Sequence, residues 1–412
     1  MKFLSSLAER AVASRLARLR NGRLVIRDGA MRTSWGEGSQ APVEIVVHDR
    51  RFYGAVAFGG AVGAGEAYAD GWWTTDDLTG VVRLLLKNRE LLEGLETGWA
   101  RLANPLRRIG HALNANSRRG SRRNIGAHYD LSNDFFRLIL DESMTYSCGV
   151  FERRGASLAD AQAAKYARIA ALLDLRTEDR VVEIGTGWGG FAIHAAARYG
   201  CHVTTTTISQ EQYDVAVARV ASAGLTHRVT VLKQDYRDLR GEYDKLVSIE
   251  MIEAVGHEYF DTFFAKCGEL IRPDGRGVIQ AITIADERYE AARREVDFIK
   301  RHIFPGSCIP SRAVLRRSAA AADLSFVHVD EIGLHYAETL HRWHENMRSH
   351  RDQIAALGFD ARFQRLWEFY FCYCEGGFLE RAIGTAQVVL AKSSASVAAP
   401  LRVAAVPDMV AA

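Results

Sequence analysis

Four glycines follow a short run of β-branched and apolar residues near the middle of the chain, namely Gly185, Gly187, Gly189 and Gly190. The run, residues 181–184, is typical of a buried parallel strand, and residues 191–199 have the spacing of a helix. A strand, a glycine-rich turn and a helix in this order form the place where doubly wound α/β domains bind nucleotide-like ligands. Glycine suits such a turn because the turn is sharp and the ligand approaches the backbone closely.

Two ligands compete for this turn. Gly185, Gly187 and Gly190 satisfy the GxGxxG spacing of a dinucleotide site, which expects an acidic residue about 20 residues later. The predicted second strand, residues 201–208, instead ends in threonines, and no acid appears before Glu211. Glu183 lies inside the first strand, where class I S-adenosylmethionine-dependent methyltransferases usually carry an acid. This position favours S-adenosylmethionine, with a glycine turn that binds nothing as the remaining alternative.

Helices and strands alternate along the second half of the chain. Apolar residues at helical spacing predict helices over residues 133–140, 158–173, 191–199, 210–223 and 259–270. Short β-rich runs predict strands over residues 181–184, 201–208, 229–233, 246–249, 277–284 and 387–390. This alternation indicates an α/β fold, a doubly wound and mostly parallel sheet.

The first hundred residues follow a different pattern. Residues 43–48 and 56–58 are predicted as strands and residues 78–92 as a helix, and a glycine-rich stretch over residues 59–71 lies between them. Residues 1–105 are therefore predicted to form a smaller α+β N-terminal domain. Its first 20 residues carry an apolar stripe among basic residues, which fits either a helix packed on its own domain or one lying on a lipid surface.

A basic segment separates the two patterns. There is no acidic residue between Glu96 and Asp130, but there are seven arginines: Arg101, Arg107, Arg108, Arg118, Arg119, Arg122 and Arg123. Residues 106–123 are predicted to be a linker, either a solvated loop or a contact for anionic lipid head groups, worth about 1 kcal/mol per arginine. The catalytic domain is then predicted over residues 124–392, with a disordered tail over 393–412.

Bulk properties narrow the class of protein. A length of 412 residues favours two domains, and a net charge of +3 is too small to indicate a nucleic-acid partner. No apolar run is long enough to cross a membrane, and the N-terminus does not have the pattern of a signal peptide. The six cysteines are typical of reduced thiols, and no second Cys or His pair completes a metal site beside Cys372 and Cys374. We therefore expect a cytoplasmic protein without a bound metal.

Several motifs occur in the order found in the cyclopropane-fatty-acyl-phospholipid synthase family, which the chain resembles over nearly its whole length. They begin with residues 68–73 in the N-terminal part and with Tyr146-Ser147-Cys148. They continue with the glycine turn, with residues 207–212 and 234–236, and with Glu250-Met251-Ile252-Glu253. Residues 303–306 and 374–378 complete the set.

The resemblance implies transfer of a methylene group from S-adenosylmethionine to the double bond of unsaturated phospholipid acyl chains, giving cyclopropane fatty acids. It also implies peripheral association with the inner face of the membrane, and it suggests a homodimer. Three alternatives remain: the same transfer giving methylene- or methyl-branched chains, methylation of a soluble small molecule, and a lipid-binding protein with a decayed cofactor site.

The resemblance further implies the residues that carry the chemistry. In the family, a bound bicarbonate is thought to accept the proton, and the cradle that holds it corresponds here to Cys148, Glu253, Gln280, the backbone of Ile282, and Tyr336. Gln280 departs from the best-known members, which have histidine there. Cys374 lies in a further motif and is a candidate catalytic residue, with packing as the alternative.

The cofactor residues follow from the resemblance in the same way. Tyr146 and Ser147 are expected at the methionine end of S-adenosylmethionine, and the glycines below it. Thr207 and Gln212 are expected at the ribose, and Asp235 and Tyr236 beside the adenine. Glu183, Trp188 and Ile208 complete the predicted cofactor site.

Overall fold

The computed structural model describes residues 2–39, 41–89, 132–392 and 406, so the predicted linker and nearly all of the predicted tail lie outside the described residues. The chain forms two compact units. The first contains residues 1–113, 294–305 and 340–382, and the second contains residues 114–293, 306–339 and 383–412. Within the described ranges, no helix has the length and apolar character needed to cross a bilayer.

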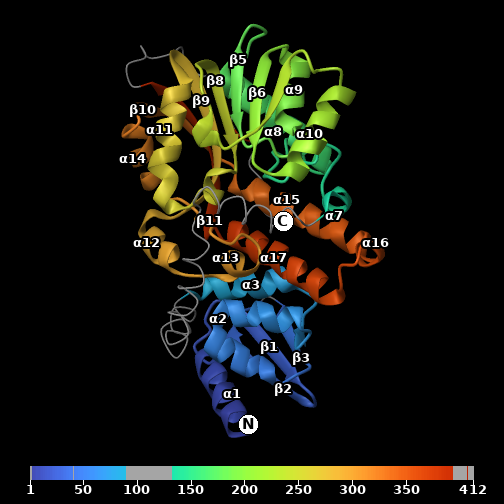
Figure 1. The fold of residues 1–412 in the computed structure, drawn as a ribbon. Coiled ribbons are helices and arrows are strands. Elements are labelled where there is room, and N and C mark those ends of the chain that lie inside the picture. The colour runs from blue at the N-terminus through green and yellow to red at the C-terminus, as the bar shows by residue number, and fades with distance from the viewer. Residues whose placement is uncertain (1, 40, 90–131, 393–405, 407–412) are drawn as a thin grey trace. The chain divides into compact units, whose positions relative to one another are not determined.

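The second unit is built on a seven-stranded sheet (Figure 1). Five parallel strands come first in the chain: β5 (Arg180–Ile184), β6 (His202–Thr207), β7 (Val229–Lys233), β8 (Tyr243–Ile249) and β9 (Ile271–Ile284). Two further strands, β10 (Leu324–Glu331) and β11 (Ile383–Lys392), complete the order β10-β11-β9-β8-β5-β6-β7. Because β11 is antiparallel to both β9 and β10, the sheet is mostly parallel, as predicted.

Helices cover both faces of this sheet. Side chains alternate along each strand, so Val181 packs with α8 (Leu158–Leu173) and α9 (Gly190–Tyr199), while Val182 packs with α11 (Phe260–Leu270) and α14 (Arg312–Ala320). Figure 1 shows these two pairs of helices on opposite sides of the strands. The remaining elements are α7 (Asn133–Ile139), α10 (Gln210–Ser222), α12 (Asp286–Arg294), and three short 3₁₀ turns, Tyr236–Asp238, Ile252–Ala254 and His257–Tyr259.

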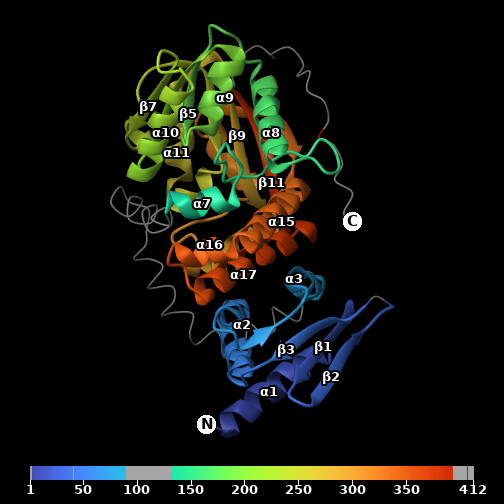
Figure 2. The same cartoon turned by 90° about the vertical axis from the view of Figure 1, so that its right-hand side faces the viewer.

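The first unit contains a four-stranded sheet, visible in Figure 2. Its order is β2-β1-β3-β4, from β1 (Gly22–Asp28), β2 (Met31–Glu37), β3 (Val43–Val47) and β4 (Trp73–Thr74). Its helices are α1 (Lys2–Leu16), α2 (Arg51–Ala69), α3 (Leu78–Lys87), α13 (Phe298–His302), α16 (Arg351–Ala356) and α17 (Ala361–Leu379). Helix α15 (Gly333–Ser349) begins in residues assigned to the second unit and ends in residues assigned to the first.

Two features of the first unit differ from the prediction. Residues 56–58 are not a strand, because they lie in α2, which continues through the glycine-rich stretch as far as Ala69 and is kinked at Gly60. Glycine serves close packing in this helix, since a side chain at Gly65 would meet the rings of Phe298 and Phe369. The unit also includes residues 294–305 and 340–382, which the sequence assigned to the catalytic domain, because α13 and α17 pack against α2. A lipid-binding or dimerisation role for residues 1–105 stays a prediction.

We predict opposite stability effects for two glycine substitutions in α2. A Cβ on Gly65 would lie 2.6 Å from ring carbons of Phe298 and 2.8 Å from Phe369, so Gly65→Ala is expected to lower the free energy of unfolding by about 1–3 kcal/mol. A Cβ on Gly54 meets nothing within 4 Å, so Gly54→Ala is expected to raise that free energy by about 0.5–1 kcal/mol. Urea unfolding measures both, and a shift of the two variants in the same direction would contradict the packing explanation.

Candidate active site

The glycine turn after β5 has the geometry predicted for a ligand site. Gly185, Gly187 and Gly189 adopt positive φ angles of 102°, 52° and 88°, and the Gly185 N–H donates to the Thr206 carbonyl oxygen at 3.1 Å. A Cβ placed on Gly187 would meet no atom within 4 Å, so open space lies beside the backbone at this turn. Because the turn lies at the carboxyl end of β5 and begins α9, it fits a nucleotide-like ligand such as S-adenosylmethionine.

Trp188 fixes this turn from the buried side. Its ring is 2 % exposed, and its indole N–H donates to Asn133 Oδ1 at 2.7 Å. The guanidinium of Arg219, on α10, donates to the carbonyl oxygens of Trp188 and Ser143 at 2.8 and 2.7 Å. The predicted cofactor residue Trp188 is therefore a support for the turn, tied by Arg219 to the segment that leads to Tyr146.

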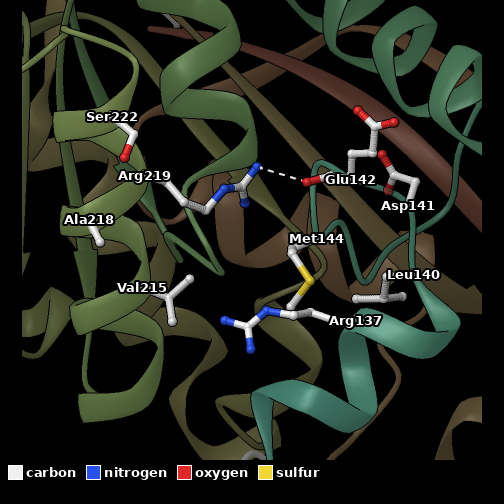
Figure 3. A pocket seen from close by; sticks show the side chains of 9 residues that line it. All are labelled: Arg137, Leu140, Asp141, Glu142, Met144, Val215, Ala218, Arg219 and Ser222. Carbon is white, nitrogen blue, oxygen red and sulfur yellow. Dashed lines mark hydrogen bonds between the residues drawn. The ribbon is translucent and has the colours of Figure 1, made fainter. Parts of the chain in front are cut away.

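A pocket of about 510 Å³ lies on the other side of this support (Figure 3). Residues of α10 face residues of α7 and of the loop after it, and Arg219 reaches across to the Glu142 carbonyl oxygen at 3.2 Å. The described lining consists of Arg137, Leu140, Asp141, Glu142, Met144, Val215, Ala218, Arg219 and Ser222. None of the predicted site residues is among them, although Arg219 connects this pocket to the glycine turn through the Trp188 carbonyl oxygen.

The ends of β6 and β7 carry the other predicted cofactor residues. Thr207 is buried, and its hydroxyl donates to Gln212 Oε1 at 2.8 Å, while Ile208, half-buried, follows it directly. Asp235 follows β7 and binds the Arg237 guanidinium in bidentate fashion, with Nε and Nη2 at 2.8 and 2.6 Å. Thr207, Gln212 and Asp235 therefore lie at the same edge of the sheet as the glycine turn, as predicted.

Two of the predicted cofactor residues, Glu183 and Tyr236, have ionisable groups that are buried in the protein. The Glu183 carboxylate is buried within β5 and accepts a hydrogen bond from the Thr205 hydroxyl at 2.6 Å. Burial raises the pKa of Glu183 to about 8, so this carboxyl is neutral at pH 7 and links β5 to β6. Tyr236 stacks near the Arg237 guanidinium, 5.6 Å from the ring centroid, and burial raises the pKa of its hydroxyl.

A buried lysine holds the segment that carries Tyr146 and Ser147. Lys165, on α8, is completely buried, and its Nζ donates to Ser147 Oγ at 2.7 Å. The neighbouring Gln162 donates to the Ser147 carbonyl oxygen at 2.9 Å. Tyr146 packs its ring 5.3 Å from the ring of Phe136. The segment is thereby fixed from below by α8, with Lys165 as a cation that the sequence analysis did not single out.

A polar cluster lies at the carboxyl end of β8, centred on the carboxylate of Glu250. Its Oε1 accepts from the Cys148 backbone N–H at 2.9 Å and from Gln280 Nε2 at 2.7 Å, and its Oε2 accepts from the Tyr336 hydroxyl at 2.7 Å. Cys148, Gln280 and Tyr336 are therefore brought together as predicted. The anion that these three residues bind is the carboxylate of Glu250, a side chain of the protein itself.

Glu253 lies one turn further on and faces different groups. Its Oε1 accepts from the Ile282 backbone N–H, and its Oε2 has no partner among the described residues. Burial and the nearby negative charge of Glu250 raise the pKa of Glu253 to about 8. The cluster therefore combines one carboxylate surrounded by donors with one carboxyl group that is neutral at pH 7.

The two predicted catalytic cysteines do not act as exposed thiols. The Cys148 side chain is completely buried and donates to the Gly149 carbonyl oxygen at 3.2 Å, so its backbone N–H is the group that enters the cluster. Cys374 lies on α17 in the first unit, whereas the cluster lies in the second. Burial raises the pKa of both thiols, which disfavours the thiolate that a nucleophile or base requires. A catalytic role of Cys374 stays a prediction.

Sequence reasoning missed three residues of this site. Glu250 was recognised only as part of a motif, although an acid directly after a parallel strand is a site signal. Gln387 was placed in the last strand without a role, and its Nε2 donates to Gln280 Oε1 at 2.9 Å. Lys165 occupies the buried face of a predicted helix, where a lysine is unusual unless it has a partner.

The hydrogen-bond donors of the polar cluster are already occupied, which bears on the predicted bicarbonate. The donors expected to bind it, namely the Cys148 backbone, Gln280 and Tyr336, bind Glu250 instead. The Ile282 N–H is used by Glu253. A second anion in this cradle would lie against the Glu250 carboxylate, so the cradle does not fit bicarbonate.

The chain is similar to several known proteins. The family model described as mycolic acid cyclopropane synthetase matches residues 116–388. The chain is 40 % identical over 384 residues to the tuberculostearic acid methyltransferase UfaA1 of Mycobacterium tuberculosis, covering 90 % of this chain and 88 % of that protein. It is 36 % identical over 357 residues to the cyclopropane-fatty-acyl-phospholipid synthase of Escherichia coli, covering 85 % and 88 %. Among solved structures, mycolic acid cyclopropane synthase CmaA1 complexed with SAH and CTAB matches with a TM-score of 0.62 and 31 % identity, covering 66 % of this chain and 98 % of that one.

We predict that Glu253→Gln changes how stability depends on pH. The folded pKa of Glu253 is raised from 4.5 to about 8, so between these values the folded protein keeps a proton that the unfolded chain releases. The Glu253 contribution to the free energy of unfolding therefore falls as pH rises through this range. Chemical unfolding at several pH values should show Glu253→Gln gaining stability relative to the wild type from pH 5 to pH 8.

The exposed carboxylate of Glu258, in the next turn, provides the control. Glu258→Gln should follow the wild-type pH dependence. A constant difference between Glu253→Gln and the wild type at every pH would contradict the assignment of a neutral buried carboxyl.

Proposed function

Because the chain belongs to the mycolic acid cyclopropane synthetase family of S-adenosylmethionine-dependent methyltransferases, we propose that it acts on the double bond of unsaturated acyl chains in membrane phospholipids. The observation that carries this proposal is the position of a buried polar cluster at the same sheet edge as the glycine turn. An alkene is a weak nucleophile, and its methylation creates a carbocation that must lose a proton out of reach of water. A buried proton acceptor beside the methyl donor meets both requirements.

Different residues of the chain bind the cofactor, position the binding segment and accept the proton. S-adenosylmethionine supplies an electrophilic methyl group when bound. The open space at Gly187 and the hydroxyl groups of Ser147 and Thr207 provide the binding surface for it. The Lys165 contact keeps the Ser147 segment in place. The polar cluster at β8 then takes up the proton that the alkylated chain must lose.

Two products are compatible with this chemistry. Loss of a proton from the transferred methyl group closes a cyclopropane ring, and this product is our first candidate because of the family and of the Escherichia coli relative. A hydride shift from the methylated carbon to the adjacent cationic carbon, followed by loss of a proton from the same methyl group, leaves a methylene branch, which a reduction outside this reaction converts to a methyl branch. This second candidate is favoured by the name of the relative that is 40 % identical over 90 % of the chain, a tuberculostearic acid methyltransferase.

We further propose that the enzyme works at the cytoplasmic face of the membrane as a peripheral protein. The support for this proposal is the arginine-rich stretch between Glu96 and Asp130, which lies outside the described residues. Each arginine near an anionic bilayer contributes about 1 kcal/mol to binding. Homodimer formation stays a prediction.

We predict that the purified protein labels unsaturated phospholipid. Incubation with S-adenosylmethionine carrying a ¹³C-methyl group and vesicles of mono-unsaturated phospholipid should place the label in the acyl chains. Mass spectrometry and proton NMR of the released fatty acids then distinguish the high-field protons of a ring from the vinylidene protons of a methylene branch.

Vesicles of saturated phospholipid are the matched control and should remain unlabelled. Label in neither lipid, together with methylation of soluble metabolites, would overturn the lipid assignment in favour of a small-molecule substrate.

We also predict that Arg122 and Arg123 bind anionic vesicles. Substituting both by Gln should weaken co-sedimentation with phosphatidylglycerol vesicles at low salt by about tenfold or more. The control removes the same charge from an exposed pair elsewhere, Arg153 and Arg154. Equal losses in the two double variants would mean that net charge, and not this segment, governs binding.

A further inference from the structure

The conformation of Glu250 is unusual for its residue type. Its φ angle is 49°, in the left-handed region that is unfavourable for a non-glycine residue. Its N–H donates to the Gln280 carbonyl oxygen at 2.8 Å, which continues the pairing of β8 with β9. The chain therefore accepts local strain at the end of β8, and the result is a carboxylate turned into the polar cluster.

The cluster around Glu250 is specific for an anion. Two N–H donors converge on Oε1, one from the Cys148 backbone and one from Gln280, and the Tyr336 hydroxyl bonds to Oε2. The amide of Gln280 cannot turn its oxygen toward Glu250 without losing the hydrogen bond that Oε1 accepts from Gln387. Since Gln280 and Gln387 are both completely buried, this orientation is fixed by the interior of the sheet.

The charges around Glu250 support a carboxylate that accepts a proton. Burial raises the pKa of Glu250, and the three hydrogen bonds together with the positive charge of Lys165 act in the opposite direction. The hydrogen bonds and Lys165 therefore stabilise the ionised form, while desolvation makes it a stronger base than a carboxylate in water. Glu253, the other carboxyl of the cluster, has its pKa raised to about 8 and does not compete as an anion at pH 7.

We propose that Glu250 is the catalytic base of this enzyme, and that its carboxylate replaces a diffusible anion such as bicarbonate in the cradle. The inference rests on the proposed function, because it names the group that removes the proton in that reaction. It follows from the donors that surround Glu250 and from the disagreement between this donor set and a bound bicarbonate.

The proton balance of the step is as follows. The π electrons of the alkene form a bond to the methyl carbon, and the bond from sulfur to that carbon breaks with its electrons left on sulfur. A Glu250 oxygen takes a proton from the resulting cation, and the electrons of the broken C–H bond form the new C–C bond of a ring or the new double bond of a branch. Glu250 is then a neutral acid, which returns its proton to water after the product leaves.

Removal of Glu250 provides the test. Glycine tolerates the positive φ angle, so Glu250→Gly is expected to fold and to bind S-adenosylmethionine with unchanged affinity by calorimetry. Its rate of lipid methylation should fall by about 10²–10⁴-fold. Added bicarbonate or formate should restore part of that rate, because the Cys148 N–H, Gln280 and Tyr336 are then open to an anion. The wild type should turn over equally in buffer scrubbed of carbon dioxide and in buffer with added bicarbonate.

A binding measurement accompanies the rates. The ¹³C NMR signal of labelled bicarbonate should broaden with Glu250→Gly and stay sharp with the wild type. Glu250→Gln is the second variant: it keeps the side-chain shape, fills the cradle, and should be inactive without rescue by either anion. Glu178→Gly, at an exposed turn, is the control and should behave as the wild type.

Three results would overturn the inference: a wild type that loses activity in scrubbed buffer and regains it with bicarbonate, a wild type that binds labelled bicarbonate, or a Glu250→Gly variant with full activity in scrubbed buffer. A wild type that methylates no acyl chain would overturn the proposed function instead. The bicarbonate binding measurement would still decide whether Glu250 occupies the cradle.

Discussion

The site depends on one constraint, which is that a carboxylate removed from water must be surrounded by hydrogen-bond donors. An unpaired buried charge costs several kcal/mol, so Glu250 is tolerated only where donors are already in position. Those donors come from three separate parts of the chain: the segment that carries Cys148, the strand that carries Gln280, and the helix that carries Tyr336. Their convergence ties the loop before α8, the sheet and α15 into a single arrangement.

The antiparallel strand β11 explains how this arrangement is kept rigid. It lies between β9 and β10, and its register places Gln387 directly opposite Gln280. The bond between the two amides is thus a cross-strand pair in the interior of a sheet, where neither side chain has room to rotate. A strand that is far from the glycine turn in sequence therefore determines which atom of Gln280 faces the catalytic carboxylate.

The sequence predicted strands β5 to β9 and β11 and helices α7 to α11 because their side chains repeat with clear periods, but it did not predict β10, α12 or α14. It failed at α2, where glycines that normally indicate a turn instead allow Gly65 to approach Phe298 and Phe369, a contact made with residues far away in the chain. Contacts between residues far apart in the chain also limited the prediction of the site. The resemblance to the family selected Cys148, Gln280 and Tyr336, and the structure brought them together. The resemblance did not show that Glu250 lies among them, because that depends on a positive φ angle and on distant donors, neither of which leaves a local pattern.

A built-in carboxylate changes what controls the reaction. An anion taken from solution occupies its cradle in proportion to its concentration and loses translational freedom on binding, whereas an attached carboxylate is present in every molecule and has lost that freedom during folding. The strain at Glu250 is part of the cost of folding, and the hydrogen bonds in the cluster offset it. Because the base cannot shift within the cradle, the C–H bond that it reaches depends on how the acyl chain lies against the end of β8. The choice between a ring and a branch then depends on whether the cation loses its proton before or after a hydride shift, not on the identity of the base.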